Sequence, residues 1–170
     1  MEDPSHLSEQ KKQFKNDIEN IFGILSLTTE SNNFLMWSHY GNSHKGFCIG
    51  LNSEIIYDQL QCIIGKVEYS DSIPRLKLFE PIEDFTKKVI GTKGKVWEYE
   101  KEYRLVVHTG ANKTYNLPKE VIVDVTLGCK MNFKDKTQII EHIKKEKLHC
   151  KIYEITQSDE KFELLKERIF

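Results

Sequence analysis

The chain has 170 residues, 39% of them hydrophobic and 11% aromatic, and its 25 Lys and Arg nearly balance its 26 Asp and Glu. A chain of this length hides roughly 70% of its unfolded surface, so a single domain spanning residues 1–170 needs neither a metal nor a disulfide to fold. The balanced charge excludes any requirement for a polyanionic partner such as bulk duplex DNA, and leaves a local basic groove open.

The predicted elements of the first half alternate helices with strands after a loosely ordered start over residues 1–13. Apolar residues at helical spacing predict helices at 14–22, 34–41, 52–61 and 83–93. Strand-like runs bounded by Gly or Pro breaks predict strands at 24–28, 47–51 and 62–70. The strand over 24–28 has one polar face, which carries Ser26 and Thr28. The run GTKGK, residues 91–95, breaks the last of these helices and is predicted to be a plain loop.

The second half is predicted to contain three strands and one helix. The strands lie at 96–108, 120–128 and 150–157, and the helix lies at 135–148. A charged tail follows over 158–170. Over the whole chain, helices and strands mix without regular alternation, which predicts an α+β fold: one domain with a mixed, mostly antiparallel sheet and flanking helices.

The cysteines and the N-terminal residues indicate the compartment. No C-x-x-C pair exists, and two of the four cysteines lie in apolar, strand-like runs, which favours reduced thiols in a cytoplasmic protein; the four are Cys48, Cys62, Cys129 and Cys150. The first residues contain no apolar signal region, and no apolar run approaches the ~20 residues of a membrane span, so no membrane partner is expected.

The window FLMWSHYGNSHKGFCIGL, residues 34–51, is the densest in side chains that do chemistry. His39 and His44 are compatible with a metal, but neither an H-E-x-x-H motif nor paired cysteines accompany them, so no metal is expected. A second reading is a histidine that bonds the backbone where a helix turns into a strand. The third is a ligand pocket, because the imidazole of His39, the phenol of Tyr40 and the indole of Trp37 offer stacking surfaces and directional hydrogen bonds.

A row of carboxylates lies in KVWEYEKEYRLVV, residues 95–107. In a strand of period two, one face carries Glu98, Glu100, Glu102 and Arg104, and the other carries Trp97, Tyr99, Lys101 and Tyr103. The acids repel one another unless Arg104 or a cationic ligand neutralises them. One reading is a solvated outer face. The other is a cleft in which Arg104 holds one carboxylate by a bidentate pair and leaves the other free.

Together the two windows resemble a known bacterial family. LMWSHYGNSHKGFCIGL, then WEYEKEYR, then VIVDVTLG are similar to domain-of-unknown-function family 2971, and the resemblance covers most of the chain from Gly23 onward. Members of the family open with an aromatic-rich strand and an Asn-Asp-Pro element. In this chain only Glu2-Asp3-Pro4 corresponds to that opening segment, so the family's N-terminal segment is expected to be missing. The family's mobile and defence-associated settings imply a toxin or phage-defence effector.

More distantly, ILSLT, FLMWSHYG, FCIGL and EYEKEYR resemble successive motifs of the ADP-ribosyltransferase fold. That resemblance implies NAD as a substrate, a nucleotide ligand, and a protein or nucleic-acid acceptor. It implies that Glu102 stabilises positive charge on the ribose, that Glu100 orients the acceptor and that His39 holds a ribose or phosphate. The implied nucleotide-binding residues are Ser26, Thr28, Trp37, Tyr40, His44, Trp97 and Arg104.

Two other functions remain open from the sequence. The first is a catalytically inactive module that binds a nucleotide or a protein through the same cleft. The second is a metal-dependent hydrolase or nuclease that uses His39, His44 and Glu102. All these enzymatic readings require the histidine window and the acidic row to line one cleft.

Overall fold

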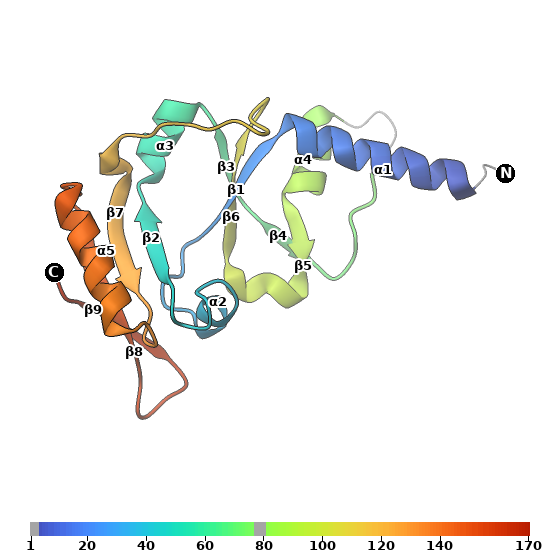
Figure 1. Cartoon of the computed structure of the whole chain (residues 1–170). Helices are drawn as coiled ribbons and strands as arrows, with labels where there is room; N and C mark the ends of the chain where they lie inside the picture. Colours follow the sequence, from blue (N-terminus) through green and yellow to red (C-terminus); the bar gives the residue numbers. More distant parts are fainter. Residues whose placement is uncertain (1–3, 77–80) are drawn as a thin grey trace.

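The chain pairs its strands into three sheets, flanked by helices (Figure 1). The computed structural model describes residues 4–76 and 81–170. The strands are β1 (Gly23–Thr28), β2 (Phe47–Leu51), β3 (Ile63–Lys66), β4 (Glu68–Ser70), β5 (Thr92–Gly94), β6 (Glu102–Val107), β7 (Ile122–Leu127), β8 (Lys151–Gln157) and β9 (Leu164–Arg168). The helices are α1 (Pro4–Ile21), α2 (Phe34–His39), α3 (Ser53–Leu60), α4 (Ile82–Ile90), α5 (Phe133–Lys145) and the 3-10 helices η1 (Lys95–Glu100) and η2 (Lys119–Val121).

The first sheet is antiparallel and has the order β1-β6-β3, so β1 and β3 form its edges in the described chain. Side chains of β6 alternate between its two faces. Leu105 lies in an apolar cluster with Ile56 of α3 and Val121. Glu102 and Arg104 point to the opposite face, where β5 and the end of α4 lie, because they bond Lys93 and the carbonyl of Ile90.

The second sheet has the order β2-β7-β8-β9, with β7 and β8 parallel and the other pairs antiparallel. Helix α5 covers one of its faces: Ile143 of the helix packs with Val125 and Leu127 of β7 and Ile152 of β8. The Asn132 side chain caps the helix by accepting from the backbone N–H of Asp135 at 2.9 Å. A third, two-stranded sheet pairs β4 with β5 in parallel.

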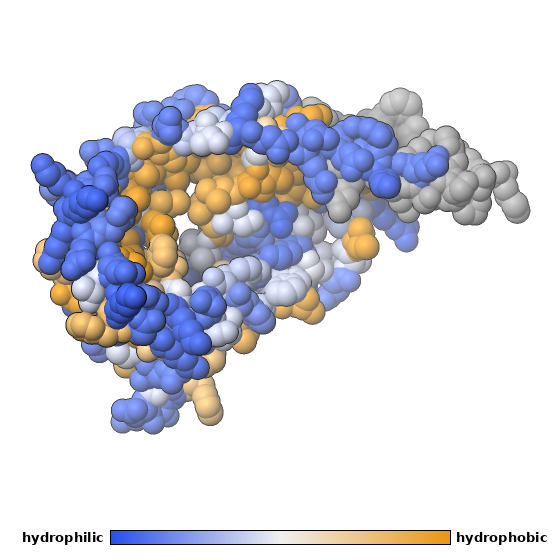
Figure 2. Space-filling view, in the orientation of Figure 1, coloured by the Kyte–Doolittle hydropathy of each residue, from blue (hydrophilic) through white to orange (hydrophobic). Residues whose placement is uncertain are grey.

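The two larger sheets face each other across a hollow around which apolar side chains gather (Figures 1 and 2). At one end they share an apolar cluster, in which Leu27 and Leu105 of the first sheet meet Leu51 and Ile122 of the second. The segment after β1 also ties the sheets together, since the Asn32 amide donates to the carbonyl of Leu164 at 3.2 Å. The molecule is therefore one α+β domain with mixed sheets.

The predicted strand over 96–108 is wrong in its first half. Residues 95–100 form η1, and Lys101 adopts the left-handed conformation with φ 44°, so β6 begins only at Glu102. Glu98 therefore does not share a strand face with Glu102. A residue at positive φ reverses the local direction of the chain, and β propensity gives no sign of it.

Four other predicted elements differ from the structure. The single strand over 62–70 is two strands in different sheets, separated at Val67. The loop GTKGK contains β5, and the charged tail contains β9. Helix α1 already begins at Pro4, so the helix is longer than predicted, while residues 1–3 of the predicted loose start lie outside the described residues. No helix of the described chain combines the length and apolar character that crossing a membrane requires.

Candidate functional site

The core of the candidate site is the carboxylate of Glu102, which is 3% exposed at the start of β6. Strand β1 lies beside it in antiparallel register, with Ser26 opposite Arg104 and Thr28 opposite Glu102. This register brings the Ser26 hydroxyl within reach, and it donates to Glu102 Oε1 at 2.6 Å. A serine on the polar face of β1, predicted from ILSLT, thus meets the acidic row directly.

Arg104 lies two residues along the same strand face and holds the Glu102 carboxylate by two nitrogens. Its Nε donates to Oε1 at 2.8 Å and its Nη2 to Oε2 at 3.3 Å, while Nη1 donates to the carbonyl of Ile90. The fork geometry of a guanidinium suits such a two-point contact. Arg104 therefore fixes both the carboxylate and the end of α4.

Glu100 reaches the same place by another route. It is the last residue of η1, and the left-handed turn at Lys101 directs its carboxylate toward Glu102 without an extended strand. Its Oε1 accepts from the Tyr40 hydroxyl at 2.8 Å, and its Oε2 accepts from Lys93 Nζ. The two glutamates thus meet at Lys93, although the extended conformation predicted between them is wrong.

Lys93 of β5 bridges the two carboxylates. Its ammonium donates to Glu100 Oε2 and, at 2.9 Å, to Glu102 Oε2. The side chains of both glutamates are 4% exposed and that of Lys93 is 22% exposed, so the lysine is the most solvent-accessible of the three. Two buried anions are balanced by Lys93 and Arg104, as buried charges require. We name these four residues, Lys93, Glu100, Glu102 and Arg104, the carboxylate cluster.

The carboxylate cluster keeps Glu102 ionised. Burial by itself raises its pKa, but hydrogen bonds from Arg104, Ser26 and Lys93 outweigh burial and lower the pKa from 4.5 to about 2. The pKa of Lys93 is raised, because the two glutamates outweigh the opposing effect of burial. The pKa of Tyr40 is raised chiefly by its hydrogen bond to Glu100, so its phenol keeps the proton that it donates. At neutral pH, Glu102 is therefore a fixed negative charge.

Aromatic side chains flank the carboxylate cluster. The His39 ring lies 6.5 Å from the Trp97 ring and 6.4 Å from the Tyr99 ring, centre to centre. Lys93 Nζ lies 5.5 Å from the centre of the Trp97 ring. Tyr40 is 63% exposed and Trp97 39%, so flat surfaces remain open to solvent beside the buried acids. The histidine of the first window and the acidic row therefore lie on one side of the molecule.

Trp37 and His44, predicted to bind a nucleotide, lie away from this cluster. The Trp37 indole is 4% exposed, packs with Ile155 and Leu164, and donates to the carbonyl of Ser31 at 2.9 Å. His44 is 3% exposed, its Nε2 lies 2.9 Å from Ser38 Oγ, and its ring packs on Phe34. The contacts of both side chains therefore stabilise the structure around α2.

Thr28 supports the site from behind. Its hydroxyl donates to the backbone carbonyl of Glu100 at 2.6 Å and accepts from the N–H of Glu30 at 3.0 Å. The first of these bonds fixes the end of η1, just before the chain turns at Lys101. Thr28 is thus a positioning residue for Glu100.

Sequence reasoning missed two contributors, Lys93 and Tyr69. The Tyr69 hydroxyl accepts from the backbone N–H of Glu102 at 2.8 Å. The positive charge of Lys93 could have indicated its role, because two buried carboxylates need more than one cation and Lys93 lies a few residues before them in the sequence. No signal in the sequence pointed to Tyr69.

The residues considered for a metal site, His39, His44 and Glu102, do not form a cluster in the described chain. His44 bonds Ser38, whereas His39 stands among the aromatic rings. In residues 4–76 and 81–170, no group of three His, Cys, Asp or Glu side chains is spaced to hold a metal ion. The metal-dependent hydrolase therefore receives no support from the geometry.

Comparison with known proteins gives a single finding about family. No curated protein and no solved structure matches the chain significantly. Residues 36–105, which contain most of α2, Lys93, both glutamates and Arg104 but not Ser26, match a family model. That model is described as protein of unknown function (DUF2971), and the match supports the family to which the sequence motifs pointed.

Proposed function

We propose that this chain is an ADP-ribosyltransferase-like enzyme that uses NAD to modify a protein or nucleic acid, with Glu102 as its central catalytic residue. One observation carries the proposal: the buried carboxylate of Glu102, held by Ser26, Arg104 and Lys93, lies beside a second glutamate and beside exposed aromatic side chains. NAD supplies an ADP-ribose whose bond to nicotinamide breaks with positive charge developing on the ribose. A preorganised anion stabilises such charge without having to reorganise.

Each residue of the site has its own role in the proposed reaction. Glu102 faces the developing charge and is held in place by Ser26 and Arg104. Glu100, whose carboxylate is fixed by Tyr40, accepts the proton of the attacking acceptor group. Trp97 and Tyr40 offer stacking surface for the nicotinamide ring, and His39 offers a hydrogen bond to a ribose or phosphate.

Lys93 has to leave the carboxylates for this reaction to proceed, because its ammonium covers Oε2 of both glutamates. A phosphate of the nucleotide offers the lysine a new anionic partner. The most exposed member of the cluster is then the one that moves. This requirement makes Lys93 part of the proposed binding step.

The second candidate is a binding module without catalysis. It is favoured by the saturation of Glu102, whose two oxygens already accept from Ser26, Arg104 and Lys93. A carboxylate bound in this way stabilises the junction of β1, β5 and β6 without any reaction. In that case the aromatic surfaces alone would bind the ligand.

The test is incubation with NAD labelled in its adenylate part, in the presence of a cell lysate. We expect release of nicotinamide and transfer of label to macromolecules, and we expect Glu102→Gln to reduce both by at least about 100-fold, since it removes the charge while keeping the shape. Glu98→Gln is the matched control, because Glu98 is exposed in the same stretch of sequence. It should retain full activity.

Folding and function are separated in the same experiment. The circular dichroism spectrum and the melting temperature of Glu102→Gln show what fraction of the variant is folded at the assay temperature. If NAD remains intact with the unchanged protein while a nucleotide raises its melting temperature, the binding module is correct and the transferase is rejected. Equal activity of the Glu98 and Glu102 variants would also reject Glu102 as the catalytic group.

A further inference from the structure

A second polar cluster lies on the sheet β2-β7-β8-β9, on the face that is turned away from α5. Glu154 of β8 points to α5, because it bonds Lys136 of that helix, so its neighbour Tyr153 points to the other face. Asp124 of β7 shares this other face with Ile122, which meets the first sheet. The face therefore borders the hollow between the two larger sheets (Figures 1 and 2).

Lys166 of β9 is at the centre of this cluster. Its Nζ lies 3.2 Å from Ser31 Oγ, 3.5 Å from Asp124 Oδ1 and 4.2 Å from the centre of the Tyr153 ring. Asp124 Oδ1 also accepts from the Thr126 hydroxyl at 3.4 Å. Because the first three distances start from one nitrogen, these side chains surround a common point. We name Ser31, Asp124, Thr126, Tyr153 and Lys166 the hollow cluster.

The two charges of the hollow cluster are incompletely paired. The side chains of Lys166 and Asp124 are only 21% and 24% exposed. Charge-assisted hydrogen bonds are typically about 2.7–2.9 Å long. Within residues 4–76 and 81–170, every hydrogen bond of these two charged groups is 3.2 Å or longer, and Asp124 Oδ2 accepts none. Charges removed from water need close partners, so both groups have capacity to bind a ligand.

A second ion pair of the same sheet shows that this separation is local. Lys136 and Glu154 lie on the face covered by α5, and their side chains are 22% and 28% exposed, close to the values for Lys166 and Asp124. The Lys136 ammonium nevertheless bonds the Glu154 carboxylate directly. Similar burial thus gives a closed ion pair under the helix and an open one at the hollow.

The surroundings of the open pair combine a close backbone with weakly polar side chains. Residue 50 of β2 is a glycine, and a Cβ there would lie 2.6 Å from Asp124 Oδ2, so only glycine leaves room for this carboxylate. Burial and the charge of Asp124 raise the pKa of the Cys48 thiol, which stays neutral beside the pair. A ligand at the hollow cluster therefore meets one positive charge, one negative charge and a weakly polar wall.

We propose that the hollow cluster binds a free α-amino acid with an apolar side chain. The ligand's carboxylate accepts from Lys166 Nζ, and its ammonium group donates to Asp124 Oδ2. A zwitterion satisfies both charges at once, whereas a simple anion or a simple cation leaves one of them unpaired. The apolar side chains that gather around the hollow then contact the side chain of the ligand (Figure 2).

This site is separate from the carboxylate cluster. Lys166 and Asp124 belong to the sheet β2-β7-β8-β9, whereas Glu102 and Arg104 belong to β1-β6-β3 and point to the face where β5 lies. The hollow cluster provides recognition without a chemical step. It follows that the amino-acid site and the proposed transferase stand or fall independently.

The probe is L-leucine, measured by calorimetric titration of the full, unchanged chain. We expect saturable binding of one molecule per chain and a rise in melting temperature. Two analogues each lack one charge: 4-methylpentanoate has no ammonium group, and 3-methylbutylamine has no carboxylate. Both should bind at least about tenfold more weakly than L-leucine, and so should L-leucine to Asp124→Asn and to Lys166→Gln.

The matched control is Lys136→Gln with Glu154→Gln, which removes the closed ion pair on the other face of the same sheet and should leave binding unchanged. The comparison of the three ligands uses the unchanged protein, so it decides the proposal even if a variant fails to fold. Absence of L-leucine binding would overturn the proposal, and so would equally strong binding of either analogue. Equal losses in the control and in folded Asp124→Asn would place the ligand elsewhere and reject the hollow cluster.

Discussion

At the scale of single residues, Lys93 determines whether two buried carboxylates can coexist. Without it, Glu100 and Glu102 would be left with Arg104 as their cation. Removing one partner from a buried charge network is strongly destabilising, because the remaining charge stays uncompensated. The lysine is therefore a structural requirement in addition to its proposed role in binding.

Lys93→Met keeps the apolar stem and removes the charge, and we expect it to lower the free energy of unfolding by about 3 kcal/mol in urea denaturation. Adding Glu100→Gln should recover part of this loss, since one anion is removed with the cation. Lys95→Met is the control. The Lys95 side chain is 58% exposed and its Nζ lies 3.8 Å from Asp71 Oδ2, so this substitution should lower the free energy of unfolding by less than about 1 kcal/mol. Equal losses for Lys93→Met and Lys95→Met would contradict the bridging role.

The ionisation of Glu102 also predicts how stability depends on pH. Its pKa is about 2 in the folded chain and 4.5 without the fold, so the folded state binds fewer protons in this range. The stabilisation is fully present above pH 4.5 and is lost as the pH falls toward 2, with a total on the order of 3 kcal/mol.

The measurement compares unfolding free energies of the unchanged protein and of Glu102→Gln from about pH 7 down to pH 2. The gap between them should be constant at neutral pH and should narrow below about pH 5, because glutamine has no proton to bind. A gap that stays constant down to the lowest pH would show that Glu102 has an ordinary pKa.

At the scale of elements, the turn between α2 and β2 is the most constrained part of the backbone. Asn42, Ser43 and His44 have φ of 48°, 53° and 67°, three consecutive left-handed residues without a glycine among them. Such a run is strained for L residues and needs support from its surroundings. The support comes from backbone hydrogen bonds: the N–H of His44 donates to the carbonyl of Trp37 at 3.1 Å, and the carbonyl of His44 accepts from the N–H of Lys130 at 2.9 Å. Beside them, the N–H of Gly128 donates to the carbonyl of Gly46 at 3.0 Å.

Gly128→Ala should disrupt this support. A Cβ there would lie 2.2 Å from the carbonyl oxygen of His44 and 2.8 Å from that of Gly46, and backbone cannot yield as a side chain can. We expect a loss of about 2–3 kcal/mol in unfolding free energy. Gly65→Ala is the matched control, since nothing lies within 4 Å of its Cβ, and it should change stability by less than about 0.5 kcal/mol.

The elements that the sequence predicts well are those whose periodicity is long and uninterrupted. Helix α5 and strands β7 and β8 were predicted within a few residues, because Ile139, Ile140 and Ile143 repeat at helical spacing and the strands carry β-branched runs. The acidic row was misassigned because Lys101 takes a left-handed conformation that glycine or asparagine usually signals. Local pattern cannot reveal a turn that tertiary contacts impose.

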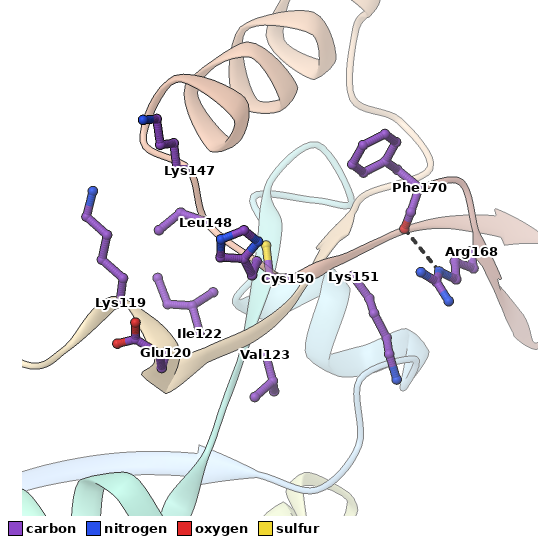
Figure 3. A pocket seen from close by; sticks show the side chains of 11 residues that line it. Lys119, Glu120, Ile122, Val123, Lys147, Leu148, Cys150, Lys151, Arg168 and Phe170 are labelled. Atoms are coloured by element: carbon purple, nitrogen blue, oxygen red, sulfur yellow. Dashed lines mark hydrogen bonds between the residues drawn. The ribbon is translucent and has the colours of Figure 1, made fainter.

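At the scale of the whole molecule, the sequence predicted the α+β class, but not the partners that distant elements bring to the acidic row. Lys93 was assigned to a plain loop, and β9 was assigned to a charged tail. A surface pocket is lined by residues between Lys119 and Phe170, so it exists only once β7, β8 and the end of the chain are assembled (Figure 3). Such sites follow from topology, which periodicity does not determine.

In the described chain, the outer strands of the three-stranded sheet, β1 and β3, each pair with β6 on one side and have no strand on the other. Ile24 and Leu25 on one strand and Ile63 on the other are 45%, 46% and 68% exposed. Open strands with apolar side chains are templates onto which another copy can add its own strand by backbone pairing. Crowded solutions of this protein should consequently favour self-association along these strands, and a charged side chain introduced at Ile63 would be the simplest means to suppress it.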